Sequence, residues 1–257
     1  MTKALATLYA ALLYGFIFLP VAVLVLFSFQ GTLFPIPPFN GLSFRWYEAV
    51  LGDQRLTSGL VNSVLVAVIT SAIATLLGFL SAWGFARFHL PASALLRGLI
   101  TLPLTVSYLI IGMGLLIFFN WIGIPKSLIA AGIGHVVINL PLCFAIIYSQ
   151  MGAHQANIER AARDLGASEA KVLLLITAPM LWPALFAAFF LSMTFSWDEF
   201  VISFLLTRFE TTLPVEIWNM LRAGLNPKTN AVGALVFGIS ILLAIIFELV
   251  AFRKRPA

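Results

Sequence analysis

Six long apolar stretches set the fold of this chain, because each is long enough to cross a lipid bilayer. A crossing helix needs about 20 consecutive, mostly apolar residues. We place the crossings at about residues 7–28, 59–86, 98–119, 127–148, 184–206 and 230–252. The stretches lack the alternation of membrane-spanning strands, and a helix satisfies its own backbone hydrogen bonds in lipid. The sequence therefore predicts an all-α membrane protein with six transmembrane helices.

The composition agrees with a chain that lies almost entirely in the membrane. Of the 257 residues, 61% are hydrophobic and only 10% are charged. No polar segment between the crossings exceeds about 35 residues, which is too short for a domain with a core of its own. We therefore expect a single transmembrane domain over residues 1–257, surrounded by lipid, with the first apolar stretch retained as a helix.

The basic residues predict on which side of the membrane each loop lies. With six crossings both termini share one side, and that side holds nine of the 15 Lys and Arg residues. These are Lys3, Arg87, Arg97, Arg160, Arg163, Lys171, Arg253, Lys254 and Arg255. Because basic residues accumulate in cytoplasmic loops, we expect both termini in the cytoplasm. The sequence has neither a basic domain nor an aromatic stacking platform, so we expect no nucleic-acid partner.

The most charged stretch lies in a loop predicted over about residues 149–183, between the fourth and fifth crossings. In "IERAARDLGAS", residues 158–168, apolar and charged residues recur with helical spacing. One face carries Ile158, Ala161, Ala162 and Leu165, and the opposite flank carries Glu159, Arg160, Arg163 and Asp164. Two turns of helix are not stable alone in water. We therefore expect the apolar face to hold the helix on the bundle and the charged flank to meet a partner, with Gly166 ending the helix.

The segment from residue 160 to 185, "RAARDLGASEAKVLLLITAPMLWPAL", resembles the cytoplasmic loop of permease subunits of binding-protein-dependent ABC importers. In that family Glu-Ala-Ala is followed by Gly, Ile and Pro at set spacings. The matching residues are Ala161, Ala162, Gly166, Ile176 and Pro179. Arg160 stands at the family's Glu position, with Glu159 one residue earlier, and Ala178 replaces the usual Leu.

The resemblance implies a type I ABC importer permease fold, in which this helix is the coupling helix that seats in a cleft of a cytoplasmic ATPase. The implied coupling residues are Glu159, Arg160, Ala161, Ala162, Arg163, Asp164 and Gly166. ATP and Mg²⁺ would be bound by that ATPase, so we expect no cofactor in this chain. The sequence lacks the phosphate-binding loop of ATPases, and its three histidines are dispersed. We expect a pathway subunit that is not an enzyme and holds no metal.

The resemblance covers nearly the whole chain and is greatest to permeases of spermidine/putrescine importers. The segments "NSVLVAVITSAIATLLGFLSAWGFARF", "SMTFSWDEFVISFLLT" and "LPVEIWNMLRAGLNPKTNAVGAL" carry it. It implies a bacterial inner-membrane permease that forms half of the translocation pathway for a small cationic solute, a polyamine. The implied partners are the ATPase subunits, an external solute-binding protein, and a second permease, either different, giving a heterodimer, or a copy of this chain.

Two acids, Asp198 and Glu199, stand inside the fifth apolar stretch, where an unpaired charge costs a few kcal/mol. Adjacent helix positions point about 100° apart, so one carboxylate can face a central cavity while the other pairs within the bundle. A carboxylate there suits a polyamine, and Trp197 offers a cation–π face. His135 and Asn139 form a polar stripe on the fourth crossing and are further candidates for the path. A structural role at a broken helix, or contact with the second permease, explains the acids equally well.

Three other functions are compatible with parts of this pattern. A permease for another small solute is the nearest alternative. An ion-coupled secondary transporter would use Asp198, Glu199 and His135 as its ion site, but the sequence shows no obvious inverted repeat, and that function leaves the charged helix unexplained. A scaffold without transport activity does not explain acids in the middle of the membrane.

Overall fold

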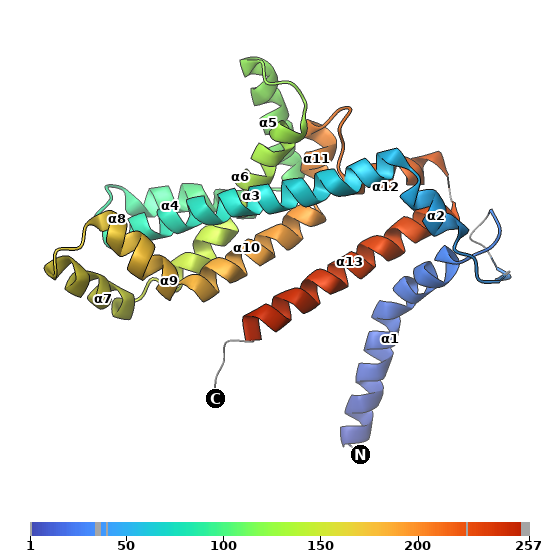
Figure 1. The fold of residues 1–257 in the computed structure, drawn as a ribbon, viewed down its shortest axis with the longest axis horizontal. Coiled ribbons are helices and arrows are strands. Elements are labelled where there is room, and N and C mark those ends of the chain that lie inside the picture. The colour runs from blue at the N-terminus through green and yellow to red at the C-terminus, as the bar shows by residue number, and fades with distance from the viewer. Residues whose placement is uncertain (1, 34–36, 40, 225, 253–257) are drawn as a thin grey trace. The chain divides into compact units, whose positions relative to one another are not determined.

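The computed structural model describes residues 2–33, 37–39, 41–224 and 226–252, and these residues form helices without a strand (Figure 1). The predicted all-α fold is therefore confirmed. Four long helices coincide with four of the predicted crossings. They are α1 (Thr2–Ser28), α3 (Gln54–Arg87), α6 (Leu128–Tyr148) and α13 (Pro227–Phe252). Arg253, Lys254 and Arg255, which support the predicted orientation, lie outside the described residues.

The other helices of the described chain are shorter, and several of them abut to form bent helices. In chain order they are α2 (Arg45–Leu51), α4 (Ser93–Thr101), the 3₁₀ helix η1 (Leu102–Thr105), α5 (Tyr108–Ile122), α7 (Ala153–Asp164), α8 (Glu169–Val172), the π-helix η2 (Leu173–Thr177), α9 (Ala178–Met180), α10 (Trp182–Trp197), α11 (Val201–Leu206) and α12 (Leu213–Ala223).

Two of the predicted crossings are bent. Helix α5 is bent by 109° from the α4–η1 segment, and α10 is bent by 74° from the segment that ends with α9. The described chain has four single helices that are long and apolar enough to cross a membrane, and up to six crossings if each bent pair counts as one. A proline lies close to each bend and removes a backbone donor there. Pro103 lies in η1, and Pro179 lies in α9. The crossing predicted at 98–119 is therefore not a continuous helix. The crossing predicted at 184–206 is also discontinuous, because α10 ends at Trp197 and α11 begins at Val201.

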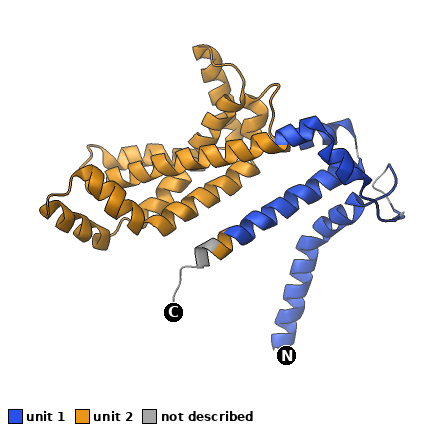
Figure 2. Cartoon of the chain, in the orientation of Figure 1, with its two compact units in different colours: residues 1–59, 215–246 blue, residues 60–214, 247–257 orange. Residues whose placement is uncertain are grey.

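The chain forms two compact units (Figure 2). One comprises residues 1–59 and 215–246, and the other comprises residues 60–214 and 247–257. The second unit contains α4 to α11 and most of α3, so every candidate residue proposed from the sequence lies in it. The single transmembrane domain over the whole chain stays a prediction.

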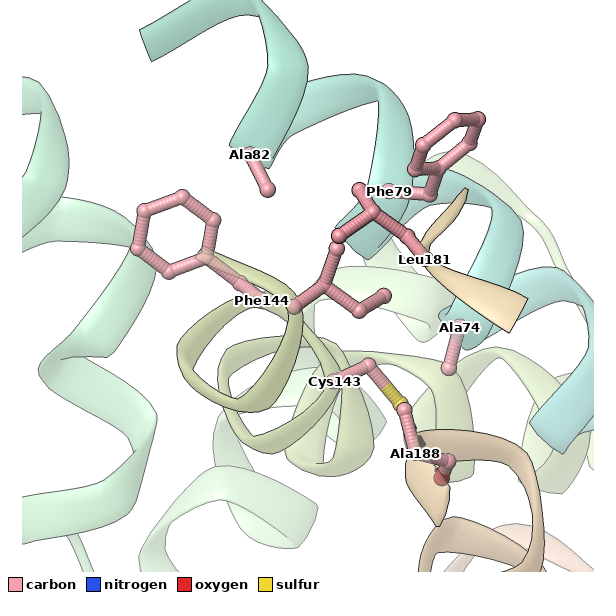
Figure 3. Close-up of a cluster of buried hydrophobic side chains, with 8 residues drawn as sticks. Ala74, Phe79, Ala82, Cys143, Phe144, Leu181 and Ala188 are labelled. Atoms are coloured by element: carbon pink, nitrogen blue, oxygen red, sulfur yellow. Dashed lines mark hydrogen bonds between the residues drawn. The ribbon is translucent and has the colours of Figure 1, made fainter. Parts of the chain in front are cut away.

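Helices α3, α6 and α10 of the second unit share an apolar core (Figure 3). Its buried residues are Ala74, Phe79, Ala82, Cys143, Phe144, Ile147, Leu181 and Ala188. Small residues let membrane helices approach closely. A Cβ atom on Gly78 would lie 2.8 Å from the Cβ of Cys143 and 2.9 Å from the backbone nitrogen of Phe144. The backbones of α3 and α6 therefore meet at Gly78.

A second apolar core joins α5, α6 and α11. Its buried residues are Phe119, Ala130, Ala131, Ile138, Ile202 and Leu206. A Cβ atom on Gly134 would clash with Ile202, and one on Gly112 would lie 2.7 Å from Leu205 Cδ1. Glycines on α5 and α6 thus make the room that α11 occupies, which fixes the short helix after the break in the fifth crossing.

In the first unit, polar contacts join the start of α3 to the start of α13. Asp53 precedes α3, and its Oδ1 accepts hydrogen bonds from the backbone nitrogens of Arg55 at 2.9 Å and Leu56 at 3.4 Å. Lys228 Nζ, in the first turn of α13, lies 2.5 Å from Asp53 Oδ2. This hydrogen bond is the main reason why the pKa of Asp53 lies below its ordinary value.

We expect Gly78→Ala to destabilise the protein, because the added methyl group would push α3 from α6. Overpacking of this kind costs about 1–3 kcal/mol. The matched control is Gly84→Ala in the same helix, where a Cβ atom would meet nothing within 4 Å, and where alanine favours the helix. Thermal unfolding in detergent measures both. Equal midpoints for the two variants would contradict the close contact.

The Asp53–Lys228 pair should make stability depend on pH. A carboxyl group whose pKa is lowered on folding stabilises the folded state above its unfolded pKa of about 3.9, and this contribution is lost as the pH falls through the folded-state pKa. Asp53→Asn should therefore lower the unfolding free energy at pH 7 by at most about 1 kcal/mol, and much less at pH 2. Lys228→Met should match it, and the double variant should add no further loss in thermal unfolding. If the losses of the two single variants add up in the double variant, Asp53 and Lys228 do not stabilise each other.

Candidate functional site

The predicted coupling helix is α7, which begins five residues earlier than the charged stretch. It ends at Asp164, and Gly166 follows with a φ of +86°. The backbone nitrogen of Gly166 donates to the carbonyl of Arg163 at 2.8 Å, and that of Ala167 donates to the carbonyl of Ala162 at 3.0 Å. Glycine adopts this left-handed conformation without strain, so Gly166 ends the helix as the sequence predicts.

The predicted orientation of α7 is wrong. Leu165, which we expected to hold the helix on the bundle, is 90% exposed, and Ile158 is 37% exposed. Glu159, which we expected to face a partner, is completely buried. The acid points inward because it has charged and hydroxyl partners there, which offset the cost of burying a carboxylate. Within residues 158–165 the exposed side chains are those of Ile158, Arg160, Ala161, Asp164 and Leu165.

Glu159 is held by two other elements of the second unit, α3 and η2. Arg87, the last residue of α3, binds it bidentately, with Nε 2.5 Å from Oε2 and Nη2 3.2 Å from Oε1. Thr177, the last residue of η2, donates its hydroxyl to Oε1 at 2.9 Å. Both carboxylate oxygens are therefore satisfied, and a bidentate guanidinium fixes direction as well as distance. We call Arg87, Glu159 and Thr177 the Glu159 cluster.

Arg163 fixes the turn after α7. Its Nε lies 2.6 Å from Glu169 Oε1, and its Nη2 lies 3.0 Å from Glu169 Oε2, so α7 and α8 are joined across Gly166. The same guanidinium lies 3.9 Å from Glu159 Oε2. Arg160, in contrast, reaches only the helix itself through Asn157 Oδ1 at 2.9 Å and the carbonyl of Ala156. Of the two arginines predicted to face a partner, Arg160 is the one that is exposed.

A second polar site lies at the break in the fifth predicted crossing. Helix α10 ends at Trp197, and α11 begins at Val201. Glu199 is buried in this break, and its carboxylate accepts hydrogen bonds from the backbone nitrogens of Ile202 at 2.9 Å and Ser203 at 3.1 Å. It therefore caps the N-terminus of α11. These hydrogen bonds are those expected for a structural role at a broken helix, one of the roles that the sequence left open for the two acids.

His135 is fully buried and joins this break to the rest of the bundle. Its Nδ1 is hydrogen-bonded to Ser196 Oγ at 2.6 Å, and its Nε2 is hydrogen-bonded to Ser203 Oγ at 2.9 Å and lies 3.5 Å from Glu199 Oε2. Ser196 also bonds Thr70 of α3 at 3.1 Å. We call Thr70, His135, Ser196, Glu199 and Ser203 the His135 network. It connects α3, α6, α10 and α11 through side chains.

The remaining candidates for the path do not join the network. Asp198 is exposed next to the buried Glu199. Asn139 and Trp197 are buried, and within the described residues Asn139 Nδ2 and Trp197 Nε1 have no hydrogen-bond partner. The five path candidates thus fall into three groups. His135 and Glu199 lie against each other. The other three are Asn139 and Trp197, which are buried with unused donors, and Asp198, which is an exposed carboxylate.

Sequence reasoning missed five residues that hold these sites. They are Thr70, Arg87, Thr177, Ser196 and Ser203. The serines carry a signal, because they are seven residues apart on either side of the acids and therefore recur on one side of a helical stretch. Arg87 carries none, because its partner is 72 residues away in the sequence.

The buried ion pair that ties the short charged helix to bent apolar helices agrees with the membrane permease subunit that the sequence predicts. Over residues 74–256 the sequence matches the family described as binding-protein-dependent transport system inner membrane component, and the chain belongs to this family.

Two curated relatives and one solved structure resemble the chain over most of its length. It is 28% identical to the spermidine/putrescine transport system permease protein PotC of Escherichia coli K12, over 94% of this chain and 92% of that protein. It is 34% identical to the putrescine transport system permease protein PotI of the same strain, over 88% and 84%. A bacterial alginate ABC transporter, solved with an alginate-bound periplasmic protein, matches with a TM-score of 0.72 at 14% identity, over 99% and 96%.

These similarities confirm the predicted type I ABC importer permease fold and the family resemblance. The chain is a permease subunit of an ABC importer in the inner membrane, and it is a pathway subunit, with ATP hydrolysis carried out by a separate ATPase. The orientation of the termini and the roles of the individual site residues stay predictions.

The two adjacent acids should respond differently to substitution. Glu199→Ala removes the cap of α11 and should cost about 0.5–2 kcal/mol of stability, because the amides of Ile202 and Ser203 then lose their acceptor. Asp198→Ala, at the exposed neighbour, should leave stability nearly unchanged. Thermal unfolding in detergent compares the two. A larger loss for Asp198→Ala would contradict the capping role of Glu199.

Proposed function

We propose that this chain forms half of the translocation pathway of an ATP-driven polyamine importer. The observation that carries the proposal is its similarity, over most of its length, to two permeases named for spermidine and putrescine transport. The fold does not select the solute, since the structural neighbour belongs to an alginate transporter. A permease for another small solute therefore remains the alternative that the experiment below has to exclude.

Asp198 is the group best suited to meet a cationic solute. It is the exposed carboxylate at the break between α10 and α11, whereas the carboxylate of Glu199 is already bonded to backbone nitrogens and lies beside His135. An ionised carboxylate accepts hydrogen bonds from ammonium groups. We propose that Asp198 contacts the solute or its entry route, and that Glu199 and His135 hold the break in shape for it.

The outward face of α7 is proposed to dock the ATPase, as the resemblance implies. Ile158 and Leu165 expose apolar side chains there, next to the charges of Arg160 and Asp164. An exposed apolar patch flanked by polar residues is typical of a protein contact. This orientation requires α7 and both termini to be in the cytoplasm, in agreement with the larger number of basic residues on that side of the predicted topology.

The first unit supports a second permease subunit as a partner. In α1 every large apolar residue from Leu5 to Leu19 is exposed, among them Tyr9, Phe16 and Phe18. Within the described chain this part of α1 stays uncovered, so lipid and a second permease, identical or different, are its available neighbours. We propose a heterodimer with a related permease, served by an external solute-binding protein, with the ATP and Mg²⁺ sites in the ATPase.

We expect Asp198→Asn to lower polyamine-stimulated ATP hydrolysis by about tenfold, which corresponds to roughly 1.4 kcal/mol. ATP hydrolysis in the absence of solute should fall by a smaller factor. The matched control is Glu210→Gln, which neutralises another exposed acid. The assay uses the complete importer and its binding protein in proteoliposomes, with spermidine, putrescine and alginate oligosaccharide compared as solutes. Failure of both polyamines to stimulate hydrolysis or uptake would overturn the polyamine proposal.

A further inference from the structure

The Glu159 cluster is an unusual way to hold a short helix outside the membrane. Apolar contact is the usual anchor for an amphipathic helix, yet Leu165 and Ile158 point outward. The contact to the bundle is made by a buried carboxylate bound to Arg87 and Thr177. Such a pair is costly to bury and costly to break, so a helix held in this way moves together with its partners.

The partners of Glu159 belong to the two helices that meet again at the His135 network. Arg87 ends α3, and Thr70 lies on the same helix about 25 Å away at 1.5 Å per residue. Thr177 ends η2, which continues through α9 into α10, where Ser196 lies. Thr70 and Ser196 are 3.1 Å apart. The Glu159 cluster and the His135 network therefore join the same two helices at two separate levels.

The segment that Thr177 terminates is itself irregular. Residues 173–177 form a π-helix, Pro179 follows, and the axis bends by 74° before α10. A π-helix inserted in an α-helix often marks a functional site. A displacement of α7 would therefore act on α10 through an irregular, bent segment, while it would act on α3 through the end of one uninterrupted helix.

We propose that Glu159 is a positioning residue for coupling: its carboxylate is the joint through which movement of α7 reaches α3 and α10, and it does not contact the ATPase. This inference rests on the proposed function, because the movement is imposed by an ATPase docked on the outward face of α7. The exposed residues of α7 contact the ATPase, and the buried Glu159 passes the displacement of α7 to both α3 and α10.

The test is the amount of solute taken up per ATP hydrolysed by the complete importer in proteoliposomes. Glu159→Gln keeps the size of the side chain but removes the charge that Arg87 binds. It should keep the ATPase subunits bound and lower uptake per ATP at least about fivefold, the lower end of typical coupling energies. The matched control is Glu210→Gln, which neutralises an exposed acid outside both polar sites and should leave uptake per ATP unchanged.

A second variant separates positioning from folding. Arg87→Met alone leaves the carboxylate of Glu159 buried without its partner, and should reduce the yield of folded protein. Combined with Glu159→Met it replaces the pair by apolar groups of similar size, which is often well tolerated. The double variant should recover its thermal midpoint and remain poorly coupled. Recovery of normal uptake per ATP together with stability would overturn the proposal, because the ion pair would then serve folding only.

A surface variant distinguishes failure of this inference from failure of the proposed docking. Leu165→Glu on the outward face should release the ATPase subunits, as measured by copurification. If Leu165→Glu releases them and Glu159→Gln leaves uptake per ATP normal, docking stands and the role of Glu159 is overturned. If Glu159→Gln itself releases the ATPase, Glu159 belongs to the docking face, which also overturns the proposal. If Leu165→Glu retains the ATPase, the docking face is wrong, and uptake per ATP alone decides the role of Glu159.

Discussion

Lipid offers no hydrogen bonds, so each break in a membrane helix needs partners from the protein itself. The break between α10 and α11 frees the backbone nitrogens of Ile202 and Ser203, and Glu199 accepts their hydrogen bonds. His135 then lies against the carboxylate, and Ser196 continues the chain of contacts. Four helices are tied together by the need to close one break, which is why the acid lies where an apolar residue would otherwise be favoured.

A buried carboxylate also needs partners from the protein at the Glu159 cluster, where groups from α3 and η2 satisfy it. Between the two polar sites lies the apolar core around Cys143, in which the backbones of α3 and α6 approach each other closely at Gly78. Polar contacts at two levels therefore define which helices stay together, and close apolar packing between them resists sliding. Between these two levels the chain bends after α9, the short helix that contains Pro179, before it continues as α10.

The sequence was sufficient for the fold class, the long helices and the family, because these depend on local apolar length and on one contiguous motif. It was insufficient for the direction of α7. Helical spacing shows that two faces differ, but it does not show which is covered by the chain and which by a partner. Here Leu165 is outward and Glu159 inward. The pair of Glu159 with Arg87 spans 72 positions, so no local pattern reveals it. The break capped by Glu199 was one of the alternatives that the two acids allowed.

The outward leucine of α7 also bears on the life of the subunit before assembly. Leu165 is 90% exposed, and in a newly inserted permease without its ATPase this side chain would meet water. Exposed apolar surface of this kind is what chaperones and proteases recognise, and the amount of a protein in the cell follows from that triage. If the ATPase docks on α7 as proposed, its binding would cover Leu165 and remove that signal, so the exposed leucine would mark subunits that have not yet been assembled.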